Sequence, residues 1–296
     1  MCFAARSVLF LPHYLQRLYH FFEYTLFLEV ITMKKRIVLT VILSLLVCMS
    51  MVAVSAKDTA ISWYCVRNKD HRQPTADSVL RVVEQYNGYY VDRAHGDDNE
   101  DKVIYLTFDA GYENGNVAKI LDILHAEQVT GAFFILDHLI VDNTALVCRM
   151  AEEGHIVANH TAKHRDITKM ESKEALQKEL SALEERYKVK TGREMSKYFR
   201  PPEGKFSEQS MQWLSELGYQ TVFWSVAYAD WDNQRQPDPA VARAKIMDHL
   251  HNGAIILLHP TSATNVKILG DLIQECRTLG YRFGSLEELT ANASRA

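Results

Sequence analysis

Residues 103–115 read Val-Ile-Tyr-Leu-Thr-Phe-Asp-Ala-Gly-Tyr-Glu-Asn-Gly, an apolar run that leads into a carboxylate and a glycine-rich turn. The run Val103–Phe108 is rich in β-branched and aromatic residues, which is typical of a buried strand. After the turn, Val117–Glu127 has the 3.6-residue periodicity of a helix. Strand, turn and helix in this order form one βα unit, with Asp109 directly after the strand.

The same unit recurs along the chain. Further short apolar runs are predicted as strands at residues 131–136, 155–158, 198–199, 221–226, 254–258 and 281–283. Periodic stretches of helix length lie between most of them, at residues 144–153, 173–187, 208–217, 240–250 and 267–279, and several end at a glycine. Strands that alternate with helices in this way predict an α/β protein with a parallel sheet or barrel.

Composition narrows the class of protein. The chain of 296 residues is 24% charged and 47% hydrophobic, which indicates a globular protein with a sizeable core. Residues 1–56 carry five basic and two acidic side chains, whereas residues 57–296 carry 28 basic and 35 acidic ones, a net charge of −7. A mildly acidic body without a basic stripe argues against nucleic acid as a partner.

The N-terminal part has the layout of a targeting segment. Residues 33–56 comprise a basic start (MKKR), the apolar run Ile37–Val54 and the small residues of Val54-Ser55-Ala56, as in a secretory signal. The apolar run also approaches the length that spans a bilayer, so an uncleaved anchor stays open. Residues 1–32 are interpreted as an extension from a start codon assigned too early, with Met33 as the true start. Residues 57–100 are expected to form an irregular preface that packs on a main domain at residues 101–290.

Ionisable residues follow five of the predicted strands, each at the strand end. They are Asp109, His160 with His164, Arg200, Asp230 and His259. Because the carboxyl ends of parallel strands meet at one edge of a sheet or barrel, we expect these side chains to converge on an active site.

His160 and His164 are the metal-ligand candidates. Histidines at i and i+4 on one helical turn point the same way, and neutral imidazole suits Zn²⁺, Fe²⁺ or Co²⁺. An isolated pair with this spacing is more often two surface histidines, but this pair begins at a strand end, beside Asn159.

Each of the other candidates has a structural alternative. Asp109 suits a base or a ligand but also a helix cap. Arg200, on the rigid Pro201-Pro202 turn, suits a group that orients a carboxylate but also a plain salt bridge. His259, at the end of an apolar strand, suits a general acid but also a core histidine. Tyr228 and Trp231 near the same edge are expected to offer stacking surface for a sugar ring.

The ordered motifs resemble a known family. Thr107-Phe108-Asp109, His160-x-x-x-His164, Arg200-Pro201-Pro202, Asp230-Trp231 and Leu257-x-His259 are similar, in order, to the five motifs of the polysaccharide deacetylase (NodB-homology) family. The longer strings FDAGYENG, RPPEGKFS and VFWSVAYADWD resemble the delta-lactam-biosynthetic de-N-acetylase branch. This branch removes the acetyl group from N-acetylmuramic acid in peptidoglycan, on the way to the muramic δ-lactam of spore cortex.

The resemblance implies a distorted parallel (β/α)7-type barrel and a metal-dependent amide hydrolase. It implies Asp109 as general base, His160 and His164 as metal ligands, and Arg200 as the group that orients the base. It further implies Asp230 as a residue that tunes the site and His259 as general acid. The metal is expected to be Zn²⁺, with Co²⁺, Mn²⁺ or Fe²⁺ as alternatives, and a backbone N–H near Pro202 and Glu203 is expected to hold the oxyanion.

One position departs from the family pattern. The usual first motif has a second Asp, the third metal ligand, where this chain has Ala110. Two alternatives therefore stay open: a deacetylase of another glycan, such as chitin or another N-acetylglucosamine polymer, and a non-catalytic glycan-binding relative. The expected partner is the peptidoglycan glycan strand, with membrane contact only through the N-terminal segment. We expect a monomer that is exported to the cell wall, the extracellular face or the spore envelope.

Overall fold

The computed structural model describes residues 13–57, 59–64 and 69–293, and the chain divides into two units, Met1–Ala56 and Lys57–Ala296. In the first unit, α1 (His13–Lys57) is a single helix of 45 residues that runs on to the start of the second. Among the described residues, no helix is both long and apolar enough to cross a membrane. The predicted targeting segment, residues 33–56, falls within α1.

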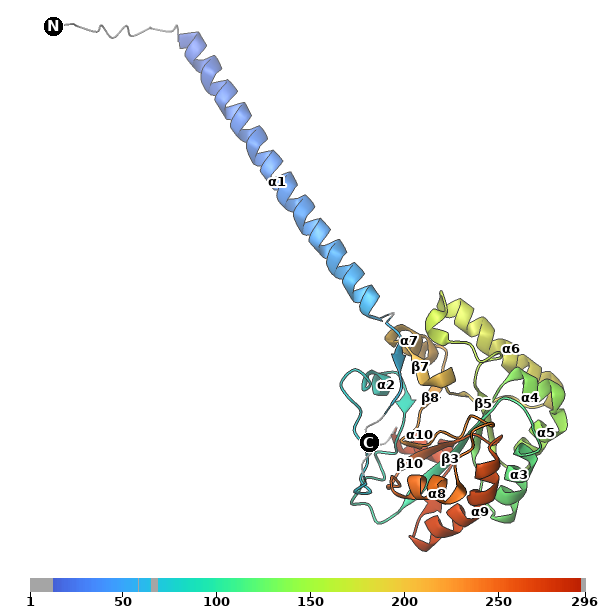
Figure 1. Ribbon diagram of the computed structural model, residues 1–296. Coiled ribbons are helices and arrows are strands. Elements are labelled where there is room, and N and C mark those ends of the chain that lie inside the picture. Colours follow the sequence, from blue (N-terminus) through green and yellow to red (C-terminus); the bar gives the residue numbers. More distant parts are fainter. Residues whose placement is uncertain (1–12, 58, 65–68, 294–296) are drawn as a thin grey trace. The chain divides into compact units, whose positions relative to one another are not determined.

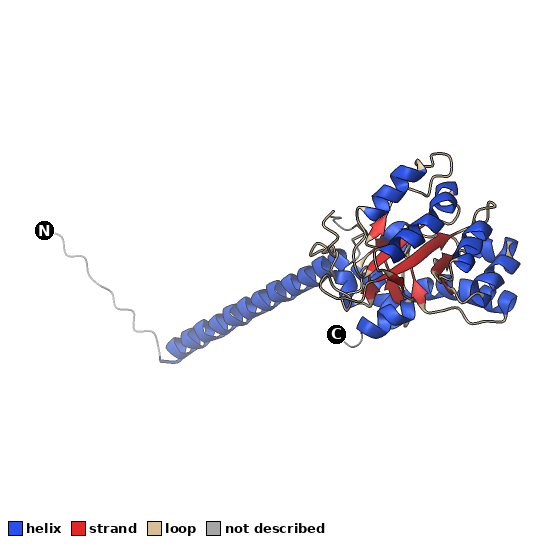
Figure 2. Cartoon of the chain, turned by 90° about the horizontal axis from the view of Figure 1, so that it is seen from below, coloured by secondary structure: helices blue, strands red, loops and turns tan. Residues whose placement is uncertain are grey.

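The second unit is built on a parallel sheet of nine strands, which helices surround in Figures 1 and 2. Eight strands lie in the order β2 (Gly88–Tyr89), β8 (Gln220–Val222), β6 (Tyr198–Phe199), β5 (Ile156–Asn159), β4 (Ala132–Ile135), β3 (Val103–Ala110), β10 (Ala254–Leu258) and β9 (Val226–Ala227). The ninth strand, β11 (Arg282–Phe283), pairs with the first two residues of β3, whereas β4 pairs with the last four. The central strand β3 therefore organises the sheet.

One short segment brings the two ends of the sheet together. The sequence predicts a single strand at residues 221–226, but the structure contains two strands, β8 and β9, joined by residues 223–225. β8 pairs with β6, and β9 pairs with β10 at the other end of the strand order. The chain changes partner at this point, which curls the sheet into the distorted (β/α)-type barrel that the sequence predicts.

The helices follow the strands as the periodicity predicts, with two additions. The helices are α3 (Val117–Ala126), α4 (Asp137–Asp142), α5 (Thr144–Glu152), α6 (Lys173–Thr191), α7 (Glu208–Glu216), α8 (Pro239–Met247), α9 (Ala263–Thr278) and α10 (Leu286–Ala293). The sequence analysis missed α4 and α10, which have only six and eight residues, too few to establish a periodic pattern. α9 packs against both α3 and α8, and α6 packs against α4, α5 and α7.

The described part of residues 57–100 contributes three short elements: β1 (Ile61–Ser62), α2 (Val82–Gln85) and β2. β2 joins the main sheet, and β1 pairs with β7 (Lys205–Phe206) in a separate antiparallel pair. Trp63 is buried, and its Nε1 donates a hydrogen bond of 2.9 Å to the carbonyl of Trp224. This segment therefore packs against the chain that follows Arg200.

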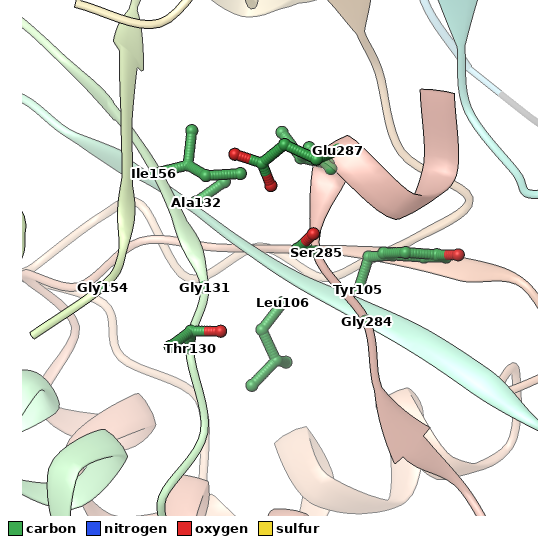
Figure 3. A pocket seen from close by; sticks show the side chains of 11 residues that line it. Tyr105, Leu106, Thr130, Gly131, Ala132, Gly154, Ile156, Gly284, Ser285 and Glu287 are labelled. Carbon is green, nitrogen blue, oxygen red and sulfur yellow. The ribbon is translucent and has the colours of Figure 1, made fainter. Parts of the chain in front are cut away.

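A small cavity lies toward the amino ends of the strands. Figure 3 shows Tyr105, Thr130, Ser285 and Glu287 around it, and its volume is about 30 Å³. That volume is comparable to one water molecule and too small for a sugar. None of the residues expected to carry the chemistry lines it.

Candidate active site

Residues from five strand ends converge at the carboxyl edge of the sheet. Asp109 is the last residue but one of β3, which ends at Ala110, and His160 follows β5 directly. Arg200 follows β6, Asp230 lies three residues beyond β9, and His259 follows β10. The expected convergence is present. The side chains form two pairs, each of one carboxylate and one basic group: Asp109 with Arg200, and Asp230 with His259.

Arg200 is fully buried, and its guanidinium is bonded on every side. Nη1 donates to Oδ1 of Asp109 at 2.8 Å, and Nη2 donates to the hydroxyl of Thr107 at 2.8 Å. Nε donates to the carbonyl of Val222 at 2.8 Å, and Cζ lies 4.2 Å from the ring centroid of Phe134. A buried cation requires such partners, so Arg200 holds Asp109 in one orientation.

Asp109 is ionised despite its burial. Its side chain is 11% exposed, and burial by itself raises the pKa of a carboxyl group. The positive charge of Arg200, and then His160 and His259, outweigh this effect and lower the pKa below the ordinary value. Asp109 is therefore a carboxylate at neutral pH, able to accept a proton or to bind a cation.

The two histidines meet through a loop and not through a helix. The expected helical turn at residues 160–164 is wrong, because Thr161 and His164 have positive φ angles of 66° and 54°, which a right-handed helix does not allow. The side chain of Asn159 accepts from the Thr161 N–H at 2.9 Å, which stabilises the bend. The imidazole centroids of His160 and His164 lie 5.0 Å apart, edge to face.

His160 is neutral and has a defined tautomer. Its Nδ1 donates to the carbonyl of Arg200 at 2.8 Å, so Nε2 carries the lone pair. Burial lowers the pKa of His160 to about 4, more than the nearby charge of Asp109 raises it. Neutral imidazole with a hydrogen-bonded Nδ1–H is the form in which histidine binds a metal.

Asp109 and His160 face one another as two acceptors. Nε2 of His160 lies 3.6 Å from Oδ2 of Asp109, and neither atom carries a proton. Two ligands of one Zn²⁺, each about 2.0–2.2 Å from the ion, lie at a similar separation. Within the described residues, no three His, Cys, Asp or Glu side chains already form a complete ligand group. The donor types of the neighbouring His160 and His164 fit two ligands of a divalent ion, with the carboxylate of Asp109 beside His160.

His259 and the carboxylate of Asp230 form the second pair. Nδ1 of His259 donates to Oδ1 of the fully buried Asp230 at 2.7 Å, and its backbone N–H donates to Oδ2 at 2.7 Å. Asn265 also donates to Oδ2 of Asp230, at 2.6 Å. Burial lowers the pKa of His259, but the hydrogen bond and charge of Asp230, together with Asp109, raise it above its ordinary value. His259 therefore keeps its proton to higher pH than a free histidine, as a general acid requires.

The four residues expected to contact substrate have different environments. Trp231 is 65% exposed at the rim, whereas Pro202 is buried and Glu203 is exposed with its carboxylate on Lys205. Glu203 adopts a left-handed conformation with φ 56°. The expected stacking role of Tyr228 is not supported, because the ring is buried and its hydroxyl donates to Oδ1 of Asn265.

Sequence reasoning missed two residues that support the site. Thr107 accepts from Arg200, and its own hydroxyl donates to the carbonyl of Ile256 at 2.7 Å. Asn265 bonds both Asp230 and the carbonyl of His259. A threonine inside an otherwise apolar strand is a usable signal for the first residue. The second lies in the first turn of α9, where an asparagine is unremarkable.

The comparisons with known proteins agree with this geometry. Residues 96–222 match the polysaccharide deacetylase family. Over 239 residues, the chain is 40% identical to peptidoglycan-N-acetylmuramic acid deacetylase PdaA of Bacillus subtilis (strain 168), covering 80% of this chain and 88% of that protein. The chain belongs to the polysaccharide deacetylase family.

Solved structures of family 4 carbohydrate esterases share the fold of this polysaccharide deacetylase. Bacillus subtilis PdaA has a TM-score of 0.73 and 39% identity, and the match covers 79% of this chain and 97% of that one. A family 4 carbohydrate esterase from Bacillus anthracis has a TM-score of 0.65 and 35% identity, with 79% and 98% covered. The predicted fold is therefore confirmed, and the protein is a polysaccharide deacetylase, a hydrolase of carbon–nitrogen bonds from a generally metal-dependent family.

Ala110, where the family resemblance predicts a second Asp, is the last residue of β3. Its side chain is fully buried in the hydrophobic cluster that also contains Val117, Ile135 and Leu258. The methyl group therefore packs in the core beside α3, while the carboxylate of the preceding residue, Asp109, faces His160.

Replacement of His160 by Ala should abolish binding of Zn²⁺, because it removes the buried nitrogen that faces Asp109. Isothermal titration calorimetry of the full chain with Zn²⁺ alone measures this loss. His138→Ala, which removes an exposed histidine on α4, is the matched control and should bind as the wild type does. Unchanged affinity in His160→Ala contradicts the ligand assignment.

Proposed function

We propose that this polysaccharide deacetylase removes the N-acetyl group from N-acetylmuramic acid residues of peptidoglycan. The observation that carries the proposal is the pair of contacts at one edge of the barrel: Asp109 bonded to Arg200 at 2.8 Å, and His259 bonded through Nδ1 to Asp230 at 2.7 Å. The choice of sugar rests on the similarity to PdaA, whose name states that specificity. In this proposal the product lies on the way to muramic δ-lactam, as in spore cortex.

Asp109 is the general base. Arg200 binds Oδ1, so Oδ2 is the oxygen left to accept the proton of the attacking water. The lowered pKa keeps Asp109 ready to accept at neutral pH. His160 and His164 would hold a divalent ion, which when bound would supply Lewis-acid polarisation of the acetamido carbonyl; we propose Zn²⁺, with Co²⁺, Mn²⁺ and Fe²⁺ as alternatives.

The loop after Arg200 supplies a donor for the oxyanion. Pro201 and Pro202 have no N–H, the N–H of Gly204 donates to Pro201, and that of Lys205 donates to Pro202. This leaves the N–H of Glu203 as the donor of the loop. Gly204 fixes the bend, because a Cβ there would lie 2.8 Å from Cη2 of Trp224 and 3.0 Å from Cβ of Trp63. A donor held in place before the reaction stabilises the tetrahedral oxyanion effectively.

His259 is the general acid that protonates the departing amine. The hydrogen bond from Nδ1 to Asp230 fixes the ring and leaves Nε2 to transfer the proton. A glycan-binding relative without activity needs neither this acid nor the ionised Asp109. The intact pairs therefore favour catalysis over a purely binding role.

Loss of either group should lower turnover much more than binding. Asp109→Asn and His259→Ala should each reduce the rate of acetate release about 10²–10⁴-fold, the usual contribution of a general acid or base. Affinity for the glycan should change little. Mass spectrometry of peptidoglycan fragments, with and without a chelator, should show N-acetylmuramic acid converted to muramic acid or its lactam only by the metal-loaded wild type.

His138→Ala is the control for this experiment and should keep the wild-type rate. Equal acetate release from wild type and His259→Ala removes His259 from the mechanism. Release from N-acetylglucosamine alone favours a deacetylase of another glycan, and no release from any glycan favours the binding role.

The pH profile tests the acid separately. His259 acts while it is protonated, that is, below its pKa, so the raised pKa extends activity toward higher pH. Asp230→Asn removes the charge that raises this pKa, and the alkaline limb of the kcat/KM profile should move to lower pH. Asp232→Asn makes the same change of charge two residues away and should leave that limb in place. An unmoved limb in Asp230→Asn contradicts the role of this pair.

We further propose that residues 33–56 direct the enzyme out of the cell, where peptidoglycan lies. The basic residues 34–36 and the small residues at 54–56 support this location. N-terminal sequencing of extracellular protein should begin near Lys57 if the segment is cleaved. A membrane-bound enzyme with an intact segment indicates an anchor, and a mature body in the cytosol contradicts export.

A further inference from the structure

Two exposed aromatic rings lie on loops that flank the strand of His259. Tyr112 is 51% exposed on the loop after β3, and Trp231 is 65% exposed on the loop after β9. In the sheet, β10 lies between β3 and β9, and His259 follows its last residue. The two rings therefore belong to the loops on either side of the proposed acid.

A hydrogen bond joins these two loops. Nδ2 of Asn233, two residues after Trp231, donates to the hydroxyl of Tyr112 at 2.6 Å, across 121 positions in the sequence. This bond ties the loop after β3 to the loop after β9. The ring of Tyr112 is thus positioned by a specific partner although half of its surface is exposed.

The backbone on both sides of Tyr112 is also fixed. Asn114 and Asn116 each donate to the carbonyl of Thr261, at 2.9 and 2.8 Å, and this carbonyl lies two residues after His259. A Cβ on Gly111 would lie 2.9 Å from Cδ1 of Leu136, so the chain approaches its neighbour closely there. The loop keeps the ring of Tyr112 half exposed to solvent. This position contributes little to the stability of the fold, because only buried apolar surface stabilises it.

We propose that Tyr112 is a specificity-determining residue: it stacks on a pyranose ring of the glycan strand next to the sugar that is deacetylated. In this proposal Trp231, on the loop after β9, also contacts the glycan strand. Asn233 is the positioning residue for Tyr112. This inference rests on the proposed function and adds to the site a binding position for a second sugar of the glycan strand. The enzyme therefore recognises a chain of sugars, not a single residue.

The chemistry of the patch favours a sugar over a protein or a membrane. A pyranose has apolar C–H faces and hydroxyl groups at its edges, and it needs aromatic faces with polar groups between them. Here the polar groups are Asn233, Asp232 and the Tyr112 hydroxyl. Tyr112 is three residues after Asp109 and Trp231 directly follows Asp230, so a glycan strand that places one sugar at the site passes close to both rings.

The test compares substrates of different length. Peptide-free peptidoglycan strands of two and of six sugars are incubated with the full-length, metal-loaded enzyme, and kcat and KM are measured from acetate release. Tyr112→Ala should raise KM for the six-sugar strand about tenfold, as the loss of one buried aromatic face does, with kcat nearly unchanged. KM for the two-sugar strand should rise less, so the preference for the longer strand falls.

Three variants separate stacking from general damage. Tyr112→Phe and Asn233→Ala both keep the ring but break the bond between Asn233 and the Tyr112 hydroxyl, so both should raise KM to an intermediate value without lowering kcat. Tyr64→Ala removes a tyrosine of similar exposure, 53%, whose hydroxyl binds Asp77, and should behave as the wild type does. Equal changes for both strand lengths in Tyr112→Ala, or a change in kcat alone, overturn the proposal.

A binding measurement keeps this test distinct from that of the proposed function. If the wild type releases no acetate from these strands, the proposed function fails, and the affinity of the six-sugar strand is then measured by calorimetry. Tighter binding to wild type than to Tyr112→Ala supports the aromatic subsite independently. Equal binding to both proteins, or no binding to either, overturns it.

Discussion

The buried guanidinium of Arg200 is the interaction on which the rest of the site depends. A cation with no exposure to solvent persists only if each of its donors has a partner, and here the partners come from β3, from β8 and from the segment after it. The same group orients Asp109 and offers its own backbone carbonyl to His160. Arg200 thus sets the position of Asp109 through its side chain and the tautomer of His160 through its backbone carbonyl.

The two carboxylates of the site have opposite tasks. Asp109 faces a guanidinium and remains ionised, while Asp230 is bonded by His259 and Asn265 and raises the pKa of the imidazole. Two acid–base pairs whose environments move their pKa values apart are the usual way in which one site supplies both a base and an acid at neutral pH. Ala110, where the family resemblance predicts a third metal ligand, is buried in the core, and Asp109 is the carboxylate that lies near His160.

Loops carry much of the geometry. Of the six described non-glycine residues with positive φ, Thr161, His164 and Glu203 lie in the two loops that hold the metal candidates and the oxyanion donor. Such conformations cost free energy and persist where surrounding bonds enforce them, as Asn159 does for Thr161. The loop of Tyr112 is held by the same means, with asparagine side chains in place of burial.

The sequence by itself determined the alternation of strands and helices and the set of strand ends that carry chemistry, because both are written in local periodicity and in the residue that follows each apolar run. It could not show that the predicted strand at 221–226 divides between two ends of the sheet, that the His160–His164 pair is joined by a loop, or that Tyr228 is buried on Asn265. It also missed Asn265 as a partner of Asp230. These features arise from contacts between residues far apart in the chain, such as Asp109 and Arg200, which are 91 positions apart, and only the folded, curled sheet brings such residues together.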